Sequence, residues 1–368
     1  MRAFICDFCN NTLFFENDTC LKCGNKVGFR PDQMTMLTSY AARNSGIEPC
    51  RNWSDFNACN WYATAANAVA VPQHEAGYCL ACSFNEVVPN LADPQRLALW
   101  IETERAKRRL IYTLLQLHLP LDSAGDKQGL RFRLLADERV DTGAVDPPRH
   151  DPVLIGHDSG SLTLNVVEAD DTHREAMRKR MDEPYRTMLG HLRHEIGHYY
   201  WYRLVDRTAL LQPFRDLFGD ERADYSQALE RHYAAGSTDG WQQSFVSLYA
   251  SAHPWEDFAE TWSHYIHIVD TLDTASDSAL ALRDRAIVSP LPLAANRPFA
   301  EILADWLPLA VCLNQLNRSM GMRDAYPFTL PNRVVDKLAF VHLLCLQATL
   351  ESGGAHDRTT ARTAYGLH

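Results

Sequence analysis

His194-Glu195-Ile196-Gly197-His198 is the stretch of this 368-residue chain that decides most about its fold and function. On a helix, residues four positions apart lie on one face, so the imidazoles of His194 and His198 can bind the same metal ion. Glu195 lies between them and can reach a water molecule on that metal. The pattern also arises by chance in unrelated proteins, so the surrounding sequence has to support this interpretation.

A helix from Glu183 to Asp206 is predicted around the pentapeptide. Pro184 suits the first helical position, and apolar residues recur along the stretch at the spacing of one helical face. The pentapeptide is therefore expected in the middle of a helix. Further helices are predicted at about residues 95–117, 171–181, 221–232, 254–270, 299–317 and 333–350, and strands at residues 153–156 and 161–167.

A catalytic zinc site needs a third protein ligand and an open position for water. Downstream, Pro254 marks the start of a helix on which Glu256 and Glu260 share one face. Glu256 also has an explanation without metal, because the helix dipole stabilises a carboxylate in the first turn. Together with the two histidines, Glu256 is the better candidate for the third ligand. Glu260 is then the fallback ligand or an acceptor that orients a histidine, and Asp257 is a weaker candidate for that supporting role.

Eight of the ten cysteines fall within the first 82 residues and form two groups of four. In the first group, ten residues separate two C-x-x-C pairs, which is the spacing of a zinc ribbon. In the second group only one pair has the C-x-x-C spacing, so the sequence predicts one or two structural zinc ions. The first group is Cys6, Cys9, Cys20 and Cys23, and the second is Cys50, Cys59, Cys79 and Cys82.

These cysteines are predicted to hold structure and not to catalyse, because four protein ligands leave no coordination position for water. The segment has little apolar mass for a core of its own, so metal binding is expected to supply much of its folding energy. Disulfides are the less favoured alternative, since the N-terminus lacks an apolar secretory segment and thiols stay reduced in the cytoplasm. Cys312 and Cys345, within apolar helical patterns, are expected to be buried thiols.

The sequence therefore predicts an α+β protein in three parts. Residues 1–92 form a zinc-ribbon region with one or two four-cysteine zinc sites, and residues 93–350 form a mostly helical, zincin-like catalytic domain with a small sheet. Residues 351–368 are polar and small, and are predicted to be a disordered tail. A chain of 41.7 kDa exceeds the usual size of a single core, which agrees with more than one domain.

Composition argues against several classes of partner. A net charge of -10 and a pI near 5.8 disfavour general affinity for nucleic acid or anionic membranes. The basic run from Arg105 to Arg109 is predicted to be a solvated helix face, with nucleic-acid contact as the less favoured alternative. No stretch supplies about 20 unbroken apolar residues, and the best candidate, residues 338–350, is too short. We expect a cytoplasmic protein that does not span a membrane, while its oligomeric state stays open.

Three segments resemble the zinc-binding metallopeptidases that carry an N-terminal zinc ribbon, and the resemblance runs from Cys6 to about Asp273. The segments are residues 189–201, 218–225 and 253–265. The run Pro254-Trp255-Glu256-Asp257-Phe258-Ala259 is also similar to the third-ligand segment of the Mlc titration factor peptidases, in which the glutamate two residues after proline binds zinc. This similarity implies that Glu256, and not Glu260, is the ligand, and that the protein is a gluzincin.

The leading hypothesis is a zinc metallopeptidase that acts on a peptide or protein substrate. His194, His198 and Glu256 would hold the catalytic zinc, which lowers the pKa of bound water. Glu195 would take a proton from that water as it attacks the peptide carbonyl, and would hand the proton to the leaving amine. A further donor should stabilise the oxyanion. The sequence does not rank the candidates for this role, which are Tyr199, Tyr225, His232, Tyr233 and His264.

Two alternatives stay open. The chain could be a non-catalytic, metal-stabilised binding or regulatory protein whose zinc ribbons recognise protein or nucleic acid. The intact Glu195 speaks against that alternative, because a purely structural site needs no general base. Zinc-dependent hydrolysis of an amide other than a peptide would use the same ligands. His191, one turn before His194, is expected to be packed or hydrogen-bonded outside the site, and residues 161–167 are expected to form the edge strand that peptidases of this type commonly place above the metal.

Overall fold

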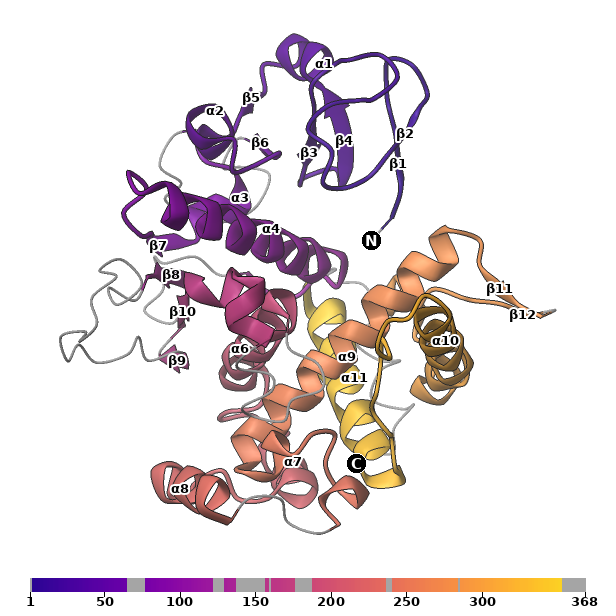
Figure 1. The fold of residues 1–368 in the computed structure, drawn as a ribbon. Coiled ribbons are helices and arrows are strands. Elements are labelled where there is room, and N and C mark those ends of the chain that lie inside the picture. The colour runs from indigo at the N-terminus through magenta and orange to yellow at the C-terminus, as the bar shows by residue number, and fades with distance from the viewer. Residues whose placement is uncertain are drawn as a thin grey trace. The chain divides into compact units, whose positions relative to one another are not determined.

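The computed structural model describes residues 2–64, 77–121, 129–136, 156–158, 160–175, 187–235, 240–283 and 285–352 (Figure 1). The fold is α+β, with a cysteine-rich N-terminal region followed by a mostly helical region, which confirms the predicted fold class. Parts of four predicted elements lie outside the described residues. They are residues 153–155 of a strand, residues 176–181 and 183–186 of two helices, and the tail from residue 353.

The chain divides into two compact units. Unit 1 contains residues 1–112 and 121–192, and unit 2 contains residues 113–120 and 193–368. The division falls inside two helices, α4 (Pro94–Gln116) and α6 (Met188–Leu204). Both helices were expected from the sequence, and α6 carries the pentapeptide in its middle. The expected domain boundary after residue 92 stays a prediction, as does the disordered tail.

Unit 1 begins with short elements around the cysteines. Three two-stranded antiparallel sheets pair β1 (Phe4–Ile5) with β2 (Thr12–Leu13), β3 (Val27–Arg30) with β4 (Thr35–Thr38), and β5 (Glu48–Pro49) with β6 (Tyr62–Ala63). Three short helices accompany them, α1 (Ser39–Asn44), α2 (Arg51–Phe56) and α3 (Leu80–Ser83). These elements are too short to be stable in isolation, so they depend for their folding on the groups that pack or bind between them.

A four-stranded sheet with the order β7-β8-β10-β9 completes unit 1. Its strands are β7 (Asn85–Val87), β8 (Arg131–Leu135), β9 (Gly156–Asp158) and β10 (Ser161–Asn165). β10 runs parallel to β8 and antiparallel to β9, so it lies inside the sheet. The expectation that residues 161–167 form an edge strand is therefore wrong, because β9 pairs with the second side of β10 and takes the edge position.

An aromatic cluster packs the cysteine-rich part of unit 1. The ring centroids of Phe15, Phe29 and Trp61 lie 4.7–6.0 Å apart, and the ring of Tyr112 on α4 lies 4.9 Å from that of Phe15. All four side chains are buried, and such contacts add to the free energy of burial. The expectation that residues 1–92 have little apolar mass for a core of their own stays a prediction, and Tyr112 of α4, beyond residue 92, adds to their aromatic cluster.

α4 also buries part of its basic run. Lys107 is fully buried and its Nζ lies 2.8 Å from Oε1 of Glu104. Arg108 is buried as well and donates a hydrogen bond to the carbonyl oxygen of Ala58. The prediction of a solvated face is therefore confirmed for Arg105, which is exposed, and wrong for Lys107 and Arg108. The reason is electrostatic, because Glu104 and the nearby cysteines supply the negative charge that keeps the two cations inside.

Unit 2 is built around helix α9 (Pro254–Asp277), and further helices follow and precede it in the chain (Figure 1). These are α7 (Leu211–Phe218), α8 (Tyr225–Ala235), α10 (Phe299–Ser319) and α11 (Asn332–Ser352), of which α7, α10 and α11 pack on α9. The small sheet of β11 (Ala281–Leu282) and β12 (Arg285–Ala286) follows α9. One face of α9 belongs to the core of unit 2, since Phe258, Trp262 and Tyr265 are fully buried. Only α7 among these helices was not expected.

α10 is the one helix among the described residues that is long and apolar enough to cross a membrane. Its best window has a mean hydropathy of 1.2 and is 33% buried, and a single helix of this kind is weak evidence for a span. α10, and not residues 338–350, is thus the most suitable candidate. Its Asp305 is fully buried and pairs with Arg285 and Arg297. Ion pairs therefore hold α10 in unit 2 in addition to apolar packing.

Candidate metal centre

Gly197 lets helices α6 and α9 approach each other closely. A Cβ atom on Gly197 would lie 3.0 Å from Cα of Ala259 and 3.1 Å from Cβ of Trp262. Normal carbon–carbon contacts are about 3.5–4.0 Å, so a larger residue would push the helices apart. The stacked rings of Tyr200 and Trp262, with centroids 4.8 Å apart, pack the same two helices. The glycine inside the pentapeptide therefore sets the distance at which α6 presents its histidines to α9.

The structure brings His194, His198 and Glu256 together in a buried cluster. Nε2 of His194 lies 3.0 Å from Oε2 of Glu256, and Nε2 of His198 lies 3.6 Å from the same oxygen. Zinc bonds to nitrogen and oxygen are about 2.0–2.2 Å long, which separates the donors of a tetrahedral site by roughly 3.3–3.6 Å. The three donors therefore match zinc in type, and their separations of 3.0 and 3.6 Å are close to those of a tetrahedral site.

Two carboxylates of α9 hold His194 from both sides of its ring. Nε2 faces Glu256, while Nδ1 lies 2.6 Å from Oε1 of Glu260. The second oxygen of Glu260 accepts a hydrogen bond of 2.7 Å from the hydroxyl of Ser247. That hydroxyl in turn accepts a bond of 3.1 Å from the backbone N–H of Ala250. Glu260 thus occupies the position of a group that orients a histidine and leaves its Nε2 to a metal.

The protonation of His194 in the metal-free protein follows from these contacts. Burial alone lowers the pKa of His194, but hydrogen bonds to Glu256 and Glu260 outweigh it and raise the pKa well above its usual value. Burial raises the pKa of the two carboxyls, whereas the charges and hydrogen bonds of the histidines lower it below its usual value. The result is an imidazolium between two carboxylates. A metal ion at Nε2 has to displace this proton.

Two tyrosines lie beside the cluster. The hydroxyl of Tyr225 donates a hydrogen bond of 2.7 Å to Oε1 of Glu256, and the ring of Tyr249 lies 5.9 Å from that of His194. Burial and the negative charge of Glu256 raise the pKa of both hydroxyls, with a smaller contribution from Glu195. Both hydroxyls therefore stay protonated at neutral pH and can donate. The buried Glu195 is close enough for its charge to act on each of them.

The structure separates the tyrosines and histidines that the sequence left unranked. Tyr225 contacts a member of the cluster directly, whereas the ring of His232 lies 6.1 Å from that of Tyr249. For the other three candidate oxyanion donors, the contacts or exposure are different. Tyr199 is buried with its ring 5.0 Å from Tyr200, Tyr233 is 61% exposed, and Nδ1 of His264 lies 2.7 Å from the hydroxyl of Tyr326.

Two residues near the cluster were missed by sequence reasoning. Tyr249 and Ser247 lie in the segment 240–253, which contains two short 3-10 helices (Trp241–Gln243 and Tyr249–Ser251) and carries no recognisable sequence motif. The only signal for them is their position just before the Pro254 helix start. His191, by contrast, was expected outside the site, and it lies in unit 1 with Nδ1 3.9 Å from Oε2 of Glu168.

Asp257 does not take the supporting role that the sequence suggested for it. Its Oδ2 accepts a bond of 2.6 Å from Nζ of Lys337, which also donates to the carbonyl oxygen of Ser244 at 2.7 Å. Burial raises the pKa of Asp257 to about 7, against the opposing effect of Lys337. Because α11 supplies this buried cation, the Asp257 carboxylate is turned to Lys337, and Glu260 alone among the predicted supporters reaches a histidine.

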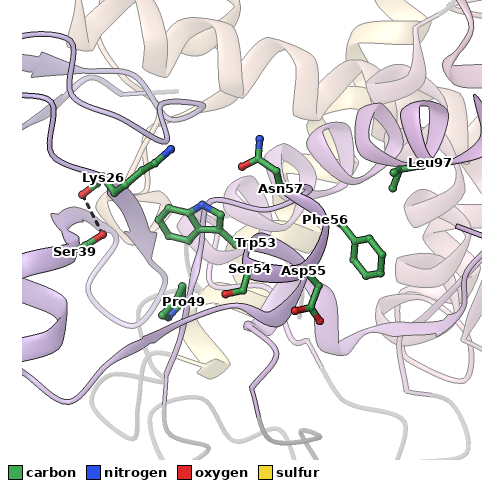
Figure 2. A pocket seen from close by; sticks show the side chains of 9 residues that line it. All are labelled: Lys26, Ser39, Pro49, Trp53, Ser54, Asp55, Phe56, Asn57 and Leu97. Carbon is green, nitrogen blue, oxygen red and sulfur yellow. Dashed lines mark hydrogen bonds between the residues drawn. The ribbon is translucent and has the colours of Figure 1, made fainter. Parts of the chain in front are cut away.

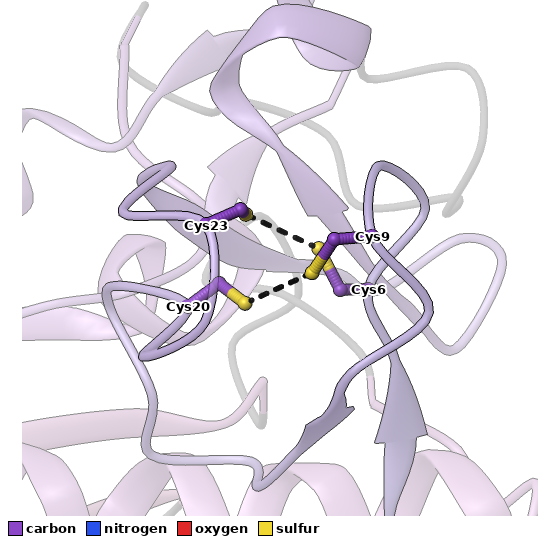
Figure 3. A group of neighbouring side chains, drawn as sticks. All are labelled: Cys6, Cys9, Cys20 and Cys23. Carbon is purple, nitrogen blue, oxygen red and sulfur yellow. Dashed lines mark hydrogen bonds between the residues drawn. The ribbon is translucent and has the colours of Figure 1, made fainter.

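The first cysteine group forms a four-sulfur cluster between two similar turns (Figure 3). The sulfur atoms of Cys6 and Cys23 are 3.9 Å apart, and those of Cys9 and Cys20 are 3.6 Å apart. Zinc–sulfur bonds of about 2.3 Å place tetrahedral ligands roughly 3.8 Å apart, whereas a disulfide bond is about 2.05 Å. Gly24 follows the second pair with φ +72°, and Asn10 takes the same place after the first pair with φ 57°. The cluster therefore fits zinc, and both turns use residues that tolerate a left-handed backbone.

The second cysteine group is more deeply buried. The sulfur of Cys59 lies 3.7 Å from that of Cys79 and 3.8 Å from that of Cys82, and all four members, including Cys50, are at most 4% exposed. Burial lowers the pKa of Arg108, but the negative charges of Cys59 and Cys82 outweigh it and raise the pKa. Zinc bound by four thiolates carries a net charge of about -2, so a buried guanidinium beside it compensates part of that charge.

Comparison with known proteins agrees with these clusters. A family model described as "Putative zinc-binding metallo-peptidase" matches residues 96–344, and a zinc-ribbon domain model matches residues 3–93. The chain is 43% identical over 365 residues to uncharacterized proteins of Mycobacterium tuberculosis and Mycobacterium bovis. These matches cover 98% of this chain and 100% of each relative. No solved structure gives a significant match.

Ser247→Ala should weaken zinc binding at His194, His198 and Glu256 by roughly 10–100-fold, because Glu260 loses the donor that fixes its carboxylate. Competition with a chelator of known affinity measures the effect. Ser247→Thr keeps the hydroxyl and should restore most of the affinity. Ser251→Ala is the matched control, since its hydroxyl donates to the carbonyl of Leu248 in the same segment. An equal loss in Ser251→Ala, or unchanged affinity in Ser247→Ala, would contradict the assignment.

Consider protein in which the two cysteine groups already hold zinc. When a further zinc ion binds at His194, His198 and Glu256 at neutral pH, we expect His194 to release a proton. Its pKa is raised in the metal-free protein, so affinity should fall as the pH falls and protons compete with zinc. Titration calorimetry in two buffers of different ionisation enthalpy counts the protons. Glu260→Gln removes one of the charges that raise this pKa and should release fewer protons. The same count in both proteins would rule out the imidazolium between two carboxylates.

Proposed function

This chain belongs to the family of zinc-binding metallo-peptidases with a zinc-ribbon domain, and we propose that it hydrolyses peptide bonds in a peptide or protein substrate. His194, His198 and Glu256 are the proposed ligands of the catalytic zinc, and Glu195 is the proposed general base. The two cysteine groups are the proposed sites of structural zinc. The division of roles follows from the number of ligands. His194, His198 and Glu256 leave one coordination position of the zinc open, whereas four cysteines leave none.

One observation carries the proposal: three donors of the right type converge within 4.8 Å of one another, with a carboxylate on the same helical turn. A structural site would need a fourth protein ligand, and the cluster of donors among the described residues does not include Glu195. Its negative charge acts on Tyr225 and Tyr249, which supports a place for it on the tyrosine side of the cluster. This is the arrangement that hydrolysis requires.

Zinc held by these residues would polarise the substrate carbonyl and make water acidic enough to react near neutral pH. Glu195 accepts the proton of the attacking water on its carboxylate and later donates it to the leaving amine. Glu256 and Glu260 keep both ring nitrogens of His194 in fixed directions. Because His194, Glu195 and Glu256 are nearly excluded from solvent, their charges are weakly screened by water.

Tyr225 is the proposed donor to the oxyanion. Its hydroxyl is protonated, lies 2.7 Å from Glu256, and belongs to a residue that is 37% exposed and so accessible to substrate. A rotation of the side chain away from Glu256 would turn the donor to a carbonyl oxygen bound beside it. The ring of Trp255, 4.1 Å from that of His198, covers the other histidine and supports a site that is shielded from water.

Glu195→Gln should lower kcat by roughly 100–10,000-fold while zinc stays bound, because the amide cannot accept the proton. The measurement is mass-spectrometric analysis of an unbiased peptide library after incubation with zinc-loaded protein, together with zinc content by elemental analysis. Glu256→Gln is the companion variant and should lose the catalytic zinc itself. A fully loaded wild-type chain that cleaves no peptide would instead favour a non-catalytic binding protein.

Tyr225→Phe should lower kcat by roughly 100–1,000-fold with little change in zinc content, as expected for loss of one oxyanion donor. Steady-state kinetics on any peptide cleaved by the wild-type chain supplies the measurement. Tyr233→Phe removes a hydroxyl from an exposed tyrosine of the same helix and serves as the control. If both variants kept wild-type kcat, the donor would have to be sought elsewhere, with Tyr249 next in line.

A further inference from the structure

Unit 1 contains a cleft of about 550 Å³ that the proposed hydrolysis does not use (Figure 2). Its volume lies in the range of about 300–1,000 Å³ that is usual for ligand sites. Of its nine lining residues, four are apolar, three are polar and two carry opposite charges. The apolar residues are Pro49, Trp53, Phe56 and Leu97, and the charged residues are Lys26 and Asp55.

The aromatic lining of the cleft is rigid. A Cβ atom on Gly28 would lie 2.5 Å from a ring atom of Trp53, so β3 has a glycine where the indole lies against it. The ring of Tyr62 packs against Trp53 at 5.5 Å, and the ring of Trp100 packs edge-on against Phe56 at 5.7 Å. Both lining rings are only partly buried. A ligand would therefore meet preformed aromatic surface, which lowers the entropic cost of binding.

The two cysteine groups frame the cleft. α2, which carries Trp53 and Phe56, begins directly after Cys50 and ends at Phe56, three residues before Cys59. On the opposite wall, Lys26 follows Cys23 by three residues and leads into β3. Metal bound by the cysteines would thus fix both walls at once. The proposed hydrolysis does not explain the role of the zinc-ribbon region. Holding the walls of this cleft in place is a role that this arrangement suggests for it.

Charge decides which kind of ligand fits. Lys26 pairs with Asp18 at 3.4 Å and Asp55 pairs with Arg51 at 3.9 Å, so both charged groups of the lining are already partly neutralised. Nucleic acids require several unpaired cations along their phosphates, which the cleft does not offer. An electrically balanced aromatic cleft with polar edges instead suits the neutral backbone and apolar side chains of a polypeptide.

We propose that this cleft binds an extended segment of another protein through a bulky apolar side chain inserted between Trp53, Phe56 and Leu97. The proposal goes beyond the proposed hydrolysis and does not depend on it. Binding can therefore be measured on the zinc-loaded, full-length chain that carries Glu195→Gln. The probes are two fluorescein-labelled, end-capped decapeptides of Gly-Ser sequence, one with Leu and Phe at its centre and one with Ser at both positions, and a labelled oligothymidylate of fifteen nucleotides.

Fluorescence anisotropy should show that the Leu-Phe peptide binds at least about tenfold more tightly than the Ser peptide and the oligothymidylate. Phe56→Ser and Leu97→Ser should each weaken its binding by at least about tenfold, since each removes part of the apolar lining. Both residues are partly exposed, and unchanged zinc content and circular dichroism verify the fold of each variant. Leu21→Ser, at a 90% exposed leucine of the same region, is the control and should bind as the parent does.

Three results would overturn the proposal. The first is failure of the Leu-Phe peptide to bind more tightly than the Ser peptide. The second is binding that Phe56→Ser and Leu97→Ser leave unchanged, which would locate the peptide at the catalytic cluster or elsewhere. The third is tighter binding of the oligothymidylate that these variants abolish, which would make the cleft a nucleic-acid site. None of these results bears on whether the parent chain cleaves peptides, so the two proposals fail separately.

Discussion

The close approach of α6 and α9 at Gly197 is the constraint on which the metal centre depends. Only because the two backbones nearly touch there can Glu256 and Glu260 reach opposite nitrogens of the same imidazole. An unpaired charge at this depth would cost several kcal/mol, which is about what loss of one member of a buried ion pair costs. The metal-free protein avoids this cost by keeping a proton on His194, between the two carboxylates.

The segment 240–253 is held against α9 by side-chain contacts at both of its ends. The ammonium group of Lys337 donates hydrogen bonds to the carbonyl oxygen of Ser244 in this segment and to Asp257 of α9. The same ammonium lies 4.4 Å from the ring centre of Phe245. At the other end of the segment, His253 caps α9 by accepting a bond from the backbone N–H of Trp255. Ser247 and the short 3-10 helix Tyr249–Ser251 lie between these anchors. Fixed neighbours of this kind are what a preorganised site requires.

The difference between local and long-range information explains what the sequence could predict. The grouping of His194, Glu195 and His198 follows from helical spacing alone, and Pro254 indicates the helix start that orients Glu256. Tyr249 and Ser247 could not be found, because their positions depend on the side chain of Lys337, about 90 residues later in the chain. The interior place of β10 likewise depends on its pairing with β8 and β9, which no pattern within its own residues reveals.

Lys107 and Arg108 were predicted to be solvated but are buried, and the anions that compensate Arg108 are cysteines of a candidate metal site. A run of basic residues on a helix is usually solvated, and a fully buried cation needs a compensating anion. Glu104 accounts for Lys107, but Arg108 faces Cys59 and Cys82, whose charge becomes permanent only when metal keeps the thiols ionised. The first cysteine group has no such buried cation beside it among the described residues, and its Cys9 and Cys23 are partly exposed. Metal at the second site would therefore be coupled electrostatically to Arg108 of α4, the helix that also carries Tyr112 of the aromatic cluster of unit 1.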